Sequence, residues 1–362
     1  MATPSAGPRI WKDDWDQARA ALVDWWNGKG LALHVVSPKD EPWEDFPAPE
    51  PALDLDQQWL DADHRLRRQL RQLAGTFHGG VAFPHYDTNV GPGSLGLFLG
   101  AHGELGPETV WYEPCIADPE THPPLRFDPN NAWYRKHVEI IERALEAADG
   151  RYVVGMPDLI ENLDTYAALR GSEEALFDLV ERRECVVRRV REINQAYFEA
   201  FDALEALIRT PWGGCGFQAF QIWGPGKTAK LQCDLSCMIG PALFEEVVAP
   251  ALAEQIAWLD YSLYHLDGTN ALQHLDILLS LPGLRAIEWT PQAGRPGGGS
   301  PVWYDLYRRI KAGGKSVQAV GVAPNEVLAL IDAVGPEGLF IMTWTPTERE
   351  ARELLRRVGW NA

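Results

Sequence analysis

The sequence lacks the features that would place the protein in a membrane or in an oxidising compartment. It has no run of about 18 apolar residues, so we expect no transmembrane helix. Its five cysteines are an odd number and include no Cys-x-x-Cys pair, which leaves no disulfide framework to read. Residues 1–17 have no apolar core, so they do not resemble a secretion signal. We therefore expect a cytoplasmic protein.

Positive charge is also scarce. Lys and Arg number 33 against 51 Asp and Glu, which gives a net charge of −18. Such a chain repels phosphate backbones and anionic lipids, so neither nucleic acid nor a membrane surface is an expected partner. Apolar residues are plentiful at 46%, and 362 residues can bury a core without disulfide or metal staples. The 15 tryptophans are unusual, and such side chains line ligand pockets as well as cores.

Short apolar runs alternate with amphipathic segments after residue 80, which predicts parallel strands joined by helices. No Gly-x-Gly-x-x-Gly segment follows a strand, and about eight strand–helix units fit this length. We therefore predict a (β/α)8 TIM barrel over residues 81–362 and an N-terminal helical extension, residues 1–80, packed on it. The expected strands are 81–84, 152–156, 217–223, 262–266, 286–289, 317–322 and 339–344. The expected helices are 11–26, 53–73, 173–208, 241–259, 271–281, 303–312, 324–334 and 346–358.

In such a barrel the C-terminal ends of the strands form the active site. Polar and aromatic residues stand at these positions in the sequence. Together they describe a pocket with aromatic walls and a few convergent polar groups, which suits a small-molecule substrate. The expected substrate-binding residues are His85, Asp158, Trp223, Trp289 and Trp344.

The strongest local signal is a candidate metal site at His265, Asp267 and Glu288. His265 and Asp267 are two residues apart on an expected strand, so their side chains share one face. Glu288 ends the next expected strand. Three such side chains can hold one divalent ion, with zinc first among the candidates, and leave positions open for a substrate. The alternative is structural, with Asp267 capping a helix that begins at residues 269–270.

Other polar residues have both a functional and a structural interpretation. Asp87 could bind substrate N–H or O–H groups or act as a base, or it could form an Asx-turn before residues 88–93. His274 fits a core histidine better than a ligand. Cys233 and Cys237 could be thiolate ligands, although cysteine is more often a small buried residue. The glycine-rich segment 294–300 favours a solvated loop over a phosphate site.

The spacing of these residues resembles the uroporphyrinogen decarboxylase superfamily. This superfamily includes the decarboxylase, corrinoid-dependent methyltransferases and cobalamin-independent methionine synthase. Asp87, followed by Pro92 and Gly96, is similar to the decarboxylase segment Asp-x4-Pro-x3-Gly, whose Asp binds the substrate. Residues 165–171 resemble its Thr-Tyr-x-x-x-Gly segment with one extra residue, which implies a catalytic role for Tyr166. Residues 234–250 and 288–290 are also similar to segments of this superfamily.

The same resemblance supports the metal site. His265-x-Asp267-Gly268 stands where the methyltransferases have His-x-Cys-Gly, whose His and Cys bind zinc. Glu288 falls near the spacing of a further zinc-binding Glu in the methionine synthase. Asp267 in place of Cys makes the site richer in oxygen, so an ion with less affinity for sulfur than zinc is also an expectation.

Two departures argue against porphyrin decarboxylation. The decarboxylase has an arginine motif near its first strand, whereas residues 31–42 contain no arginine. It also has a His after the last strand, where this chain has residues 343–346, Thr-Trp-Thr-Pro. A substrate with many carboxylates would therefore lack its cationic partners.

The resemblance implies a methyltransferase that demethylates a small O- or N-methyl substrate. The metal would act as a Lewis acid, His265 would be a catalytic residue and a ligand, and Asp87 and Tyr166 would orient the substrate. No Asp-x-His-x-x-Gly segment is present, so a corrinoid would come on a partner protein. Two alternatives stay open: a lyase that decarboxylates a small carboxylic acid with Asp87 handling the proton, and a barrel that binds a ligand without turnover.

Overall fold

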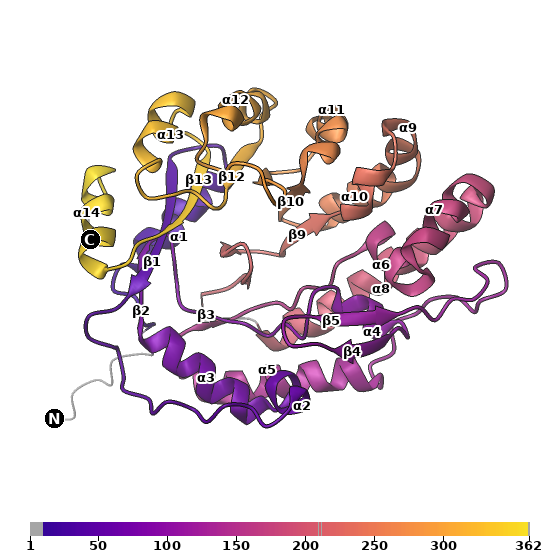
Figure 1. The fold of residues 1–362 in the computed structure, drawn as a ribbon, viewed down its shortest axis with the longest axis horizontal. Helices are drawn as coiled ribbons and strands as arrows, with labels where there is room; N and C mark the ends of the chain where they lie inside the picture. The colour runs from indigo at the N-terminus through magenta and orange to yellow at the C-terminus, as the bar shows by residue number, and fades with distance from the viewer. Residues whose placement is uncertain (1–9, 209, 211, 361–362) are drawn as a thin grey trace.

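The computed structural model describes residues 10–208, 210 and 212–360, which form a mixed α/β structure (Figure 1). Seven strands make the central sheet, in the order β2-β1-β13-β12-β11-β10-β9. Every neighbouring pair is parallel except β1 with β2. The bounds are β1 Leu31–Pro38, β2 Thr76–Gly80, β9 Thr228–Gln232, β10 Tyr261–Asp267, β11 Ala286–Thr290, β12 Ser316–Ala319 and β13 Leu339–Trp344.

Six shorter strands form three separate pairs. β3 (His85–Tyr86) is parallel to β6 (Val153–Val154). β4 (His102–Leu105) pairs with β5 (Val110–Glu113), and β7 (Cys215–Phe217) pairs with β8 (Ile222–Gly224), both antiparallel. One parallel bridge joins Met156 to Phe217. Within the described residues no ladder joins β2 to β3 or β8 to β9, so the ladders make a mostly parallel sheet and do not complete a ring.

Helices cover the outer face of the sheet, and α11 to α14 follow its curve in Figure 1. Helix α14 shows why: Ala351, Leu354 and Leu355 are buried on one face, and the Thr347 side chain caps its first turn. In the described parts of the chain no helix is long and apolar enough to cross a membrane. The helices are α1 Trp15–Trp26, α2 Leu55–Leu60, α3 Ala62–Ala74, α4 Ser94–Phe98, α5 Ala132–Ala148, α6 Asn162–Arg170, α7 Ser172–Glu181, α8 Arg183–Ile208, α9 Pro241–Leu243, α10 Ala249–Trp258, α11 Leu275–Ser280, α12 Tyr304–Ala312, α13 Val327–Val334 and α14 Glu348–Arg357. Short 3-10 or π turns are η1 Asp234–Met238, η2 Phe244–Val248, η3 Thr269–His274 and η4 Pro301–Trp303.

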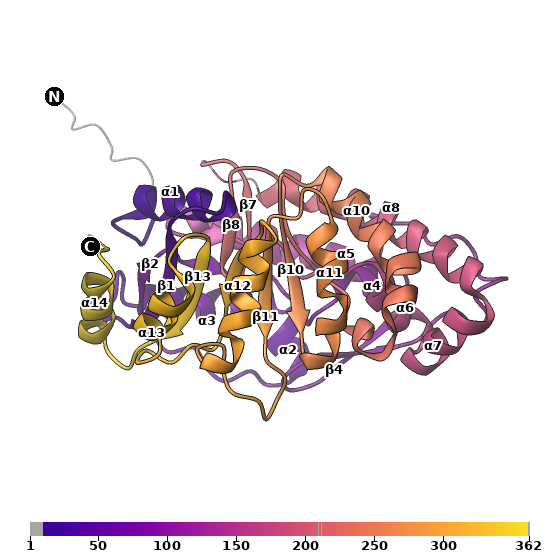
Figure 2. The ribbon, with the colours of Figure 1, turned by 90° about the horizontal axis from the view of Figure 1, so that it is seen from above.

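Helix α1 closes the inner core at one end of the strands (Figure 2). This core takes residues from the first half of several strands, such as Ala32, Leu263 and Phe340, and packs them against the α1 tryptophans. Trp25 Nε1 donates to the carbonyl of Val317 (3.1 Å) at the start of β12. Because α1 covers the N-terminal ends of the strands, their C-terminal ends form the open mouth.

The sequence predicts the last four strands well. The strands expected at 262–266, 286–289, 317–322 and 339–344 are present as β10 to β13, and that at 152–156 is present as the shorter β6. The strand expected at 217–223 is wrong, because residues 215–224 form the β7–β8 hairpin with Gln221 at φ 51° in its turn. The strand expected at 81–84 is also wrong, since those residues link β2 to β3.

The expected helices are present with shifted ends, and several of them are divided; that at 241–259, for example, consists of α9, η2 and α10. The helix expected at 53–73 breaks at Asp61 into α2 and α3, and that at 173–208 breaks at Arg182 into α7 and α8. The N-terminal 80 residues are not only helical, because β1 pairs with β13 inside the main sheet. The domain boundary at residue 80 stays a prediction, and residues 1–9 of the extension lie outside the described residues.

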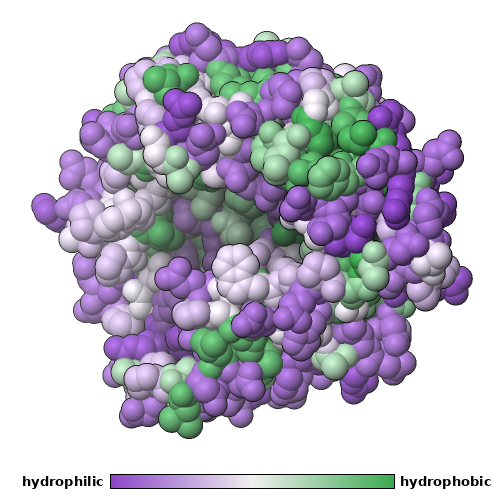
Figure 3. All heavy atoms as spheres, turned by 45° about the vertical axis from the view of Figure 1, so that its right-hand side comes forward, coloured by the Kyte–Doolittle hydropathy of each residue, from purple (hydrophilic) through white to green (hydrophobic). Residues whose placement is uncertain are grey.

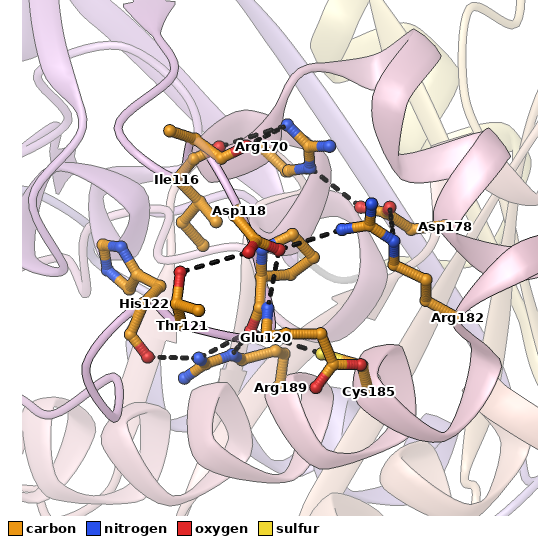
Figure 4. A network of polar contacts seen from close by, with 12 residues as sticks. Ile116, Asp118, Glu120, Thr121, His122, Arg170, Asp178, Arg182, Cys185 and Arg189 are labelled. Atoms are coloured by element: carbon orange, nitrogen blue, oxygen red, sulfur yellow. Dashed lines mark hydrogen bonds and ion pairs between the residues drawn. The ribbon is translucent and has the colours of Figure 1, made fainter.

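Arginine side chains fix the segment 114–127 on α7 and α8 (Figure 4). Arg189, 2% exposed, donates to the carbonyl of Pro119 from Nε (3.0 Å) and NH2 (2.7 Å), and to that of Pro123 (3.0 Å). Arg182 pairs with Asp118 at 2.9 Å. These contacts give backbone carbonyls of the segment fixed hydrogen-bond partners, so the segment has a fixed path.

Candidate functional site

Three side chains with metal-ligating atoms meet where β9 and β10 end. These are Asp234, His265 and Asp267, and their ligand atoms all lie within 4.8 Å of one another. We call them the ligand group; no other such group is found within residues 10–208, 210 and 212–360. Asp234 is exposed at the start of η1, whereas His265 and Asp267 are partly buried on β10. The structure thus brings together two of the three predicted ligands.

Glu288 stands behind His265 and is not a member of the ligand group, which corrects the predicted ligand set. Its buried carboxylate shares a hydrogen bond with His265 Nδ1, and Thr290 Oγ1 donates to its other oxygen at 2.7 Å. The parallel register of β10 and β11 places His265 directly beside Glu288. Because Nδ1 is engaged, Nε2 is left for a ligand, as is common for metal-binding histidines with a carboxylate behind them.

The electrostatic environment favours a cation. Burial by itself lowers the pKa of His265, but the Glu288 carboxylate and Asp234 outweigh it, so that the pKa is raised above 6.5. Local desolvation of its carboxyl group, together with the neighbouring carboxylates of Asp164 and Asp267, raises the pKa of Asp234 to about 6 even though the residue as a whole is exposed, and His265 opposes the shift. A divalent cation would relieve this repulsion, and protons would compete with it for the same atoms.

The structural alternative for Asp267, a helix cap, is wrong. The following turn η3 has no side-chain cap at its start. The Thr269 backbone N–H instead donates to Gln292 Oε1 at 3.0 Å, and the Thr269 hydroxyl donates to the same atom at 2.7 Å. Among the described residues no hydrogen bond to the Asp267 carboxylate is found, so its oxygens are available to an ion.

A buried polar cluster on β9 supports Asp234. Gln232 Nε2 donates to Asp234 Oδ2 at 2.9 Å, and Lys230 Nζ hydrogen-bonds to Gln232 Oε1. Lys230 also pairs with Asp158 at 2.8 Å, so the predicted substrate-binding Asp158 has a buried lysine as its partner. Asp164 accepts from the backbone N–H of Asp234 at 2.7 Å and thereby fixes the start of η1.

Glu161 completes this cluster from a strained segment. It accepts from the backbone N–H of Gln232 at 2.7 Å, and its burial raises its pKa to about 8. Its neighbours Ile160 and Asn162 have φ values of 49° and 42°, a region that a β-branched residue rarely enters. Such strain persists only where the surrounding structure holds it, and it is concentrated at functional sites.

A cavity of about 880 Å³ opens on the other side of the mouth, between β1, β2, β13, helix α3 and the tip of the β7–β8 hairpin. We call it the histidine cavity, because His34, His78 and His85 line it. The predicted residues Asp87 and Trp344 line it as well, and Trp344 is 63% exposed. The face in Figure 3 is hollowed near its centre, with mostly hydrophilic side chains around the opening.

The three histidines of this cavity are buried and neutral. His34, His78 and His85 are 5%, 9% and 3% exposed. Burial lowers the pKa of His34 to about 4 and the pKa values of His78 and His85 to about 3. The sequence interpretation missed His34 and His78 because they lie on β1 and β2, within the expected N-terminal extension.

Asp87 forms the Asx-turn of its structural interpretation and also lines the histidine cavity, while its role toward a substrate stays a prediction. Its Oδ1 accepts from the backbone N–H of Asn89 at 2.9 Å, which is an Asx-turn, and its side chain also lines the cavity. Gln69 fixes its backbone through two hydrogen bonds of 2.7 Å. Burial raises the pKa of Asp87 above its usual range, although the Asn89 hydrogen bond and Arg65 oppose the shift.

Three predicted site residues are core residues instead. Trp223 is 2% exposed and packs 5.7 Å from the ring of Trp15, because the hairpin turns it back toward α1. Trp289 follows the inward-facing Glu288, so it points to the outer face and packs 5.0 Å from Trp303. Tyr166 is buried under α7. None of the three lines the histidine cavity or belongs to the ligand group.

The remaining interpretations are structural. His274 is a core histidine, with a 2.9 Å hydrogen bond between Nε2 and the Ser236 carbonyl and its ring stacked 4.3 Å from Phe244. Cys233 is buried and Cys237 is exposed, and neither belongs to the ligand group. The glycine-rich loop packs against residues 320–326, since a Cβ at Gly298 would lie 2.2 Å from the carbonyl oxygen of Val320.

The tip of the β7–β8 hairpin lies between the two halves of the mouth. The Phe220 ring packs 4.9 Å from the ring of His265, while its neighbours Gln218 and Gln221 line the histidine cavity. Gln318 fixes the tip by donating to the Phe220 carbonyl at 2.7 Å. The ligand group and the cavity are therefore adjacent parts of one mouth.

No known protein family and no curated protein matches this chain. The likeness to the uroporphyrinogen decarboxylase superfamily thus stays a resemblance of spacing.

Proposed function

We propose that this protein is a metal-dependent enzyme that transfers a methyl group from a small O- or N-methyl substrate. We infer the metal dependence from the convergence of Asp234, His265 and Asp267. Glu288 orients the imidazole of His265. The choice of methyl transfer rests on the resemblance alone. In this proposal the strands surround the mouth as those of a (β/α)8 barrel do.

The side chains of the ligand group fit a divalent ion. Two carboxylates and one imidazole make a hard, oxygen-rich set that suits zinc or manganese better than a thiolate-seeking ion. Three protein ligands leave positions open for a substrate. The Asp267 carboxylate accepts no hydrogen bond from the described residues, and the pKa of Asp234 is raised. Both observations support a cation-binding site between these two side chains.

Each of the residues in the mouth would have a separate role in the reaction. The ion would supply Lewis-acid catalysis by stabilising the electron pair that stays on oxygen or nitrogen when the methyl group leaves. Glu288 would hold His265 in place, and Lys230 and Gln232 would hold Asp234. Asp87 would bind an N–H or O–H group of the substrate from the cavity. A corrinoid on a separate protein would be the methyl acceptor.

The test is a methyl-transfer assay with the zinc- or manganese-loaded protein, free cob(I)alamin, and aryl methyl ethers or methylamines as donors. We expect methylcobalamin to form, its absorbance to depend on the metal, and the rate to be lost in His265→Ala. The control His102→Ala changes an exposed histidine on β4 and should keep the rate. Absence of transfer from every donor would contradict the methyltransferase proposal.

A lyase is the second candidate, because Asp87 and Arg68 line the same cavity and could serve a small carboxylic acid. Release of carbon dioxide from such an acid by metal-free protein, lost in Asp87→Asn, would favour the lyase. Binding of a ligand with neither reaction would favour the non-catalytic alternative.

A further inference from the structure

The histidine cavity contains an unusual number of buried polar atoms without partners. Among the described residues no hydrogen bond of normal geometry is found for His34 Nδ1 or for either ring nitrogen of His78 and His85; the ring of His78 makes only a looser contact with the backbone of Leu73. Leaving a buried polar group unsatisfied costs about 1–3 kcal/mol, so native structures rarely retain several in one place. All three side chains line one cavity wall, but these nitrogens have almost no accessible surface, so a ligand supplies the missing hydrogen bonds only when the rings turn toward the cavity.

The neighbouring strands leave space for His85 in particular. A Cβ at Gly155, just after β6, would lie 2.8 Å from His85 Nε2, and one at Gly216 of β7 would lie 2.9 Å from His85 Cε1. A Cβ at either position would force the imidazole to shift, so glycine at both positions leaves room for the ring where it lies. The imidazole therefore occupies a place built for it, although no hydrogen bond holds it there.

The charges around the cavity favour an anion. Arg68 and Arg71 of α3 line it, and Asp87 is the one carboxylate among its lining residues. Behind the wall, buried Lys12 donates to the His78 carbonyl at 2.9 Å and pairs with Asp14 at 2.6 Å. The Lys12 charge also contributes to the lowered pKa values of His34 and His78. Because Asp14 neutralises Lys12, the local excess of positive charge in this chain of net charge −18 comes from Arg68 and Arg71 against the single carboxylate of Asp87.

We infer that the histidine cavity is a binding site for the anionic group of a small molecule, a carboxylate or a phosphate, recognised by His34, His78, His85 and Arg68. Imidazole and guanidinium N–H groups donate to such oxygens, and these charge-assisted hydrogen bonds are about twice as strong as neutral ones. The volume of about 880 Å³ suits a small organic ligand, and Phe83, Met342 and Trp344 offer apolar contact to its body. The site uses no atom of the ligand group, so it does not depend on a metal.

The test uses chelator-treated protein and two probes, benzoate and inorganic phosphate, each titrated by calorimetry. Long-range ¹H–¹⁵N spectra of the nine imidazoles follow the same titrations, with resonances assigned through single His→Gln variants. We expect saturable binding of one probe, with shifts confined to His34, His78 and His85. Binding of benzoate identifies a carboxylate site, and binding of phosphate identifies a phosphate site.

The variants separate recognition from folding. His85→Gln should weaken binding at least tenfold, whereas the exposed control His102→Gln should leave it unchanged. Because His85→Gln removes a buried side chain, Arg68→Gln at the exposed rim is the second variant and should also weaken binding severalfold. The inference is overturned if neither probe shifts the three histidines, or if both variants bind as tightly as the wild type. A failed metal titration would leave this result unaffected.

Discussion

Tyr166 is part of α6, and its hydroxyl donates to Oδ2 of Asp178 on α7 at 2.7 Å. Arg170 Nε donates to the same oxygen at 2.8 Å. Burial and this bond to Asp178 raise the pKa of Tyr166, so the phenol stays neutral. The motif that suggests a catalytic tyrosine therefore marks a residue that joins two helices.

We predict that Tyr166→Phe is a stability variant only. The substitution removes one hydrogen bond to the buried Asp178 carboxylate, which keeps its ion pair with Arg170. The free energy of unfolding should therefore fall by about 1–2 kcal/mol. Denaturant unfolding measures that change, and metal and ligand titrations of the folded variant should match the wild type. A variant of wild-type stability with lost binding would instead restore the role that the motif implies.

The ligand group shows what a local pattern can and cannot reveal. His265 and Asp267 are two apart on an amphipathic strand, so the period of a strand is enough to put them on one face. The sequence does not predict Asp234 as a ligand, because the strand before it is not recognised. β9, Thr-Ala-Lys-Leu-Gln, buries Lys230 and Gln232, so it lacks the apolar run that predicts a buried strand. These polar residues are stable inside only because Asp158, Glu161 and Asp234 satisfy them, and that tertiary pairing leaves no local signal.

At the scale of elements, the sequence predicts strands whose two faces are both apolar, such as β13 with its run Leu-Phe-Ile-Met-Thr-Trp. It fails where one apolar run contains a turn. Residues 217–223 are apolar enough for one strand, but Gln221 with its positive φ reverses the chain and carries Trp223 to the α1 end. That reversal also places Phe220 and Gln218 in the mouth, although neither follows the C-terminal end of a barrel strand, where site residues are expected.

The segment 114–127 gives a prediction at this scale. Arg189→Met keeps the apolar stem but removes a buried guanidinium that bonds several carbonyls of the segment, so unfolding should become easier by about 3 kcal/mol. Arg188→Met is the matched control, since Arg188 is exposed and solvent screens its pair with Glu120, so stability should be nearly unchanged. Limited proteolysis should cut within 114–127 faster in Arg189→Met alone. Equal protection of both variants would mean that the segment is held by other contacts.

At the scale of the whole molecule, the buried histidines set a pH dependence. An unfolded imidazole has a pKa of about 6.5, whereas the folded pKa values are about 4 for His34 and about 3 for His78 and His85. Below about pH 6.5 the unfolded chain binds protons that the folded chain cannot, so stability falls as the pH falls toward 3–4. Glu161 has the opposite sign, because its raised pKa of about 8 means that its contribution is lost as the pH rises through that value.

We therefore expect the melting temperature of chelator-treated protein to decrease steadily from pH 6.5 to pH 5. His78→Gln should make this decrease less steep, because one proton-binding difference between the two states is gone. Calorimetric scans at half-unit pH steps measure the slopes, and His102→Gln should keep the wild-type slope. A slope that His78→Gln leaves unchanged would show that this imidazole is not held neutral by the fold.

The central claim of the account is that Asp234, His265 and Asp267 bind one divalent ion at the mouth of the strands. The most direct measurement is calorimetric titration of zinc and manganese into chelator-treated wild type, Asp234→Asn, Asp267→Asn and the exposed control Asp276→Asn. The account predicts one ion per wild-type chain, unchanged binding by Asp276→Asn, and affinity lower by more than tenfold, about 1.4 kcal/mol, in the other two variants. No binding by the wild type, or wild-type affinity in both Asp234→Asn and Asp267→Asn, would contradict it.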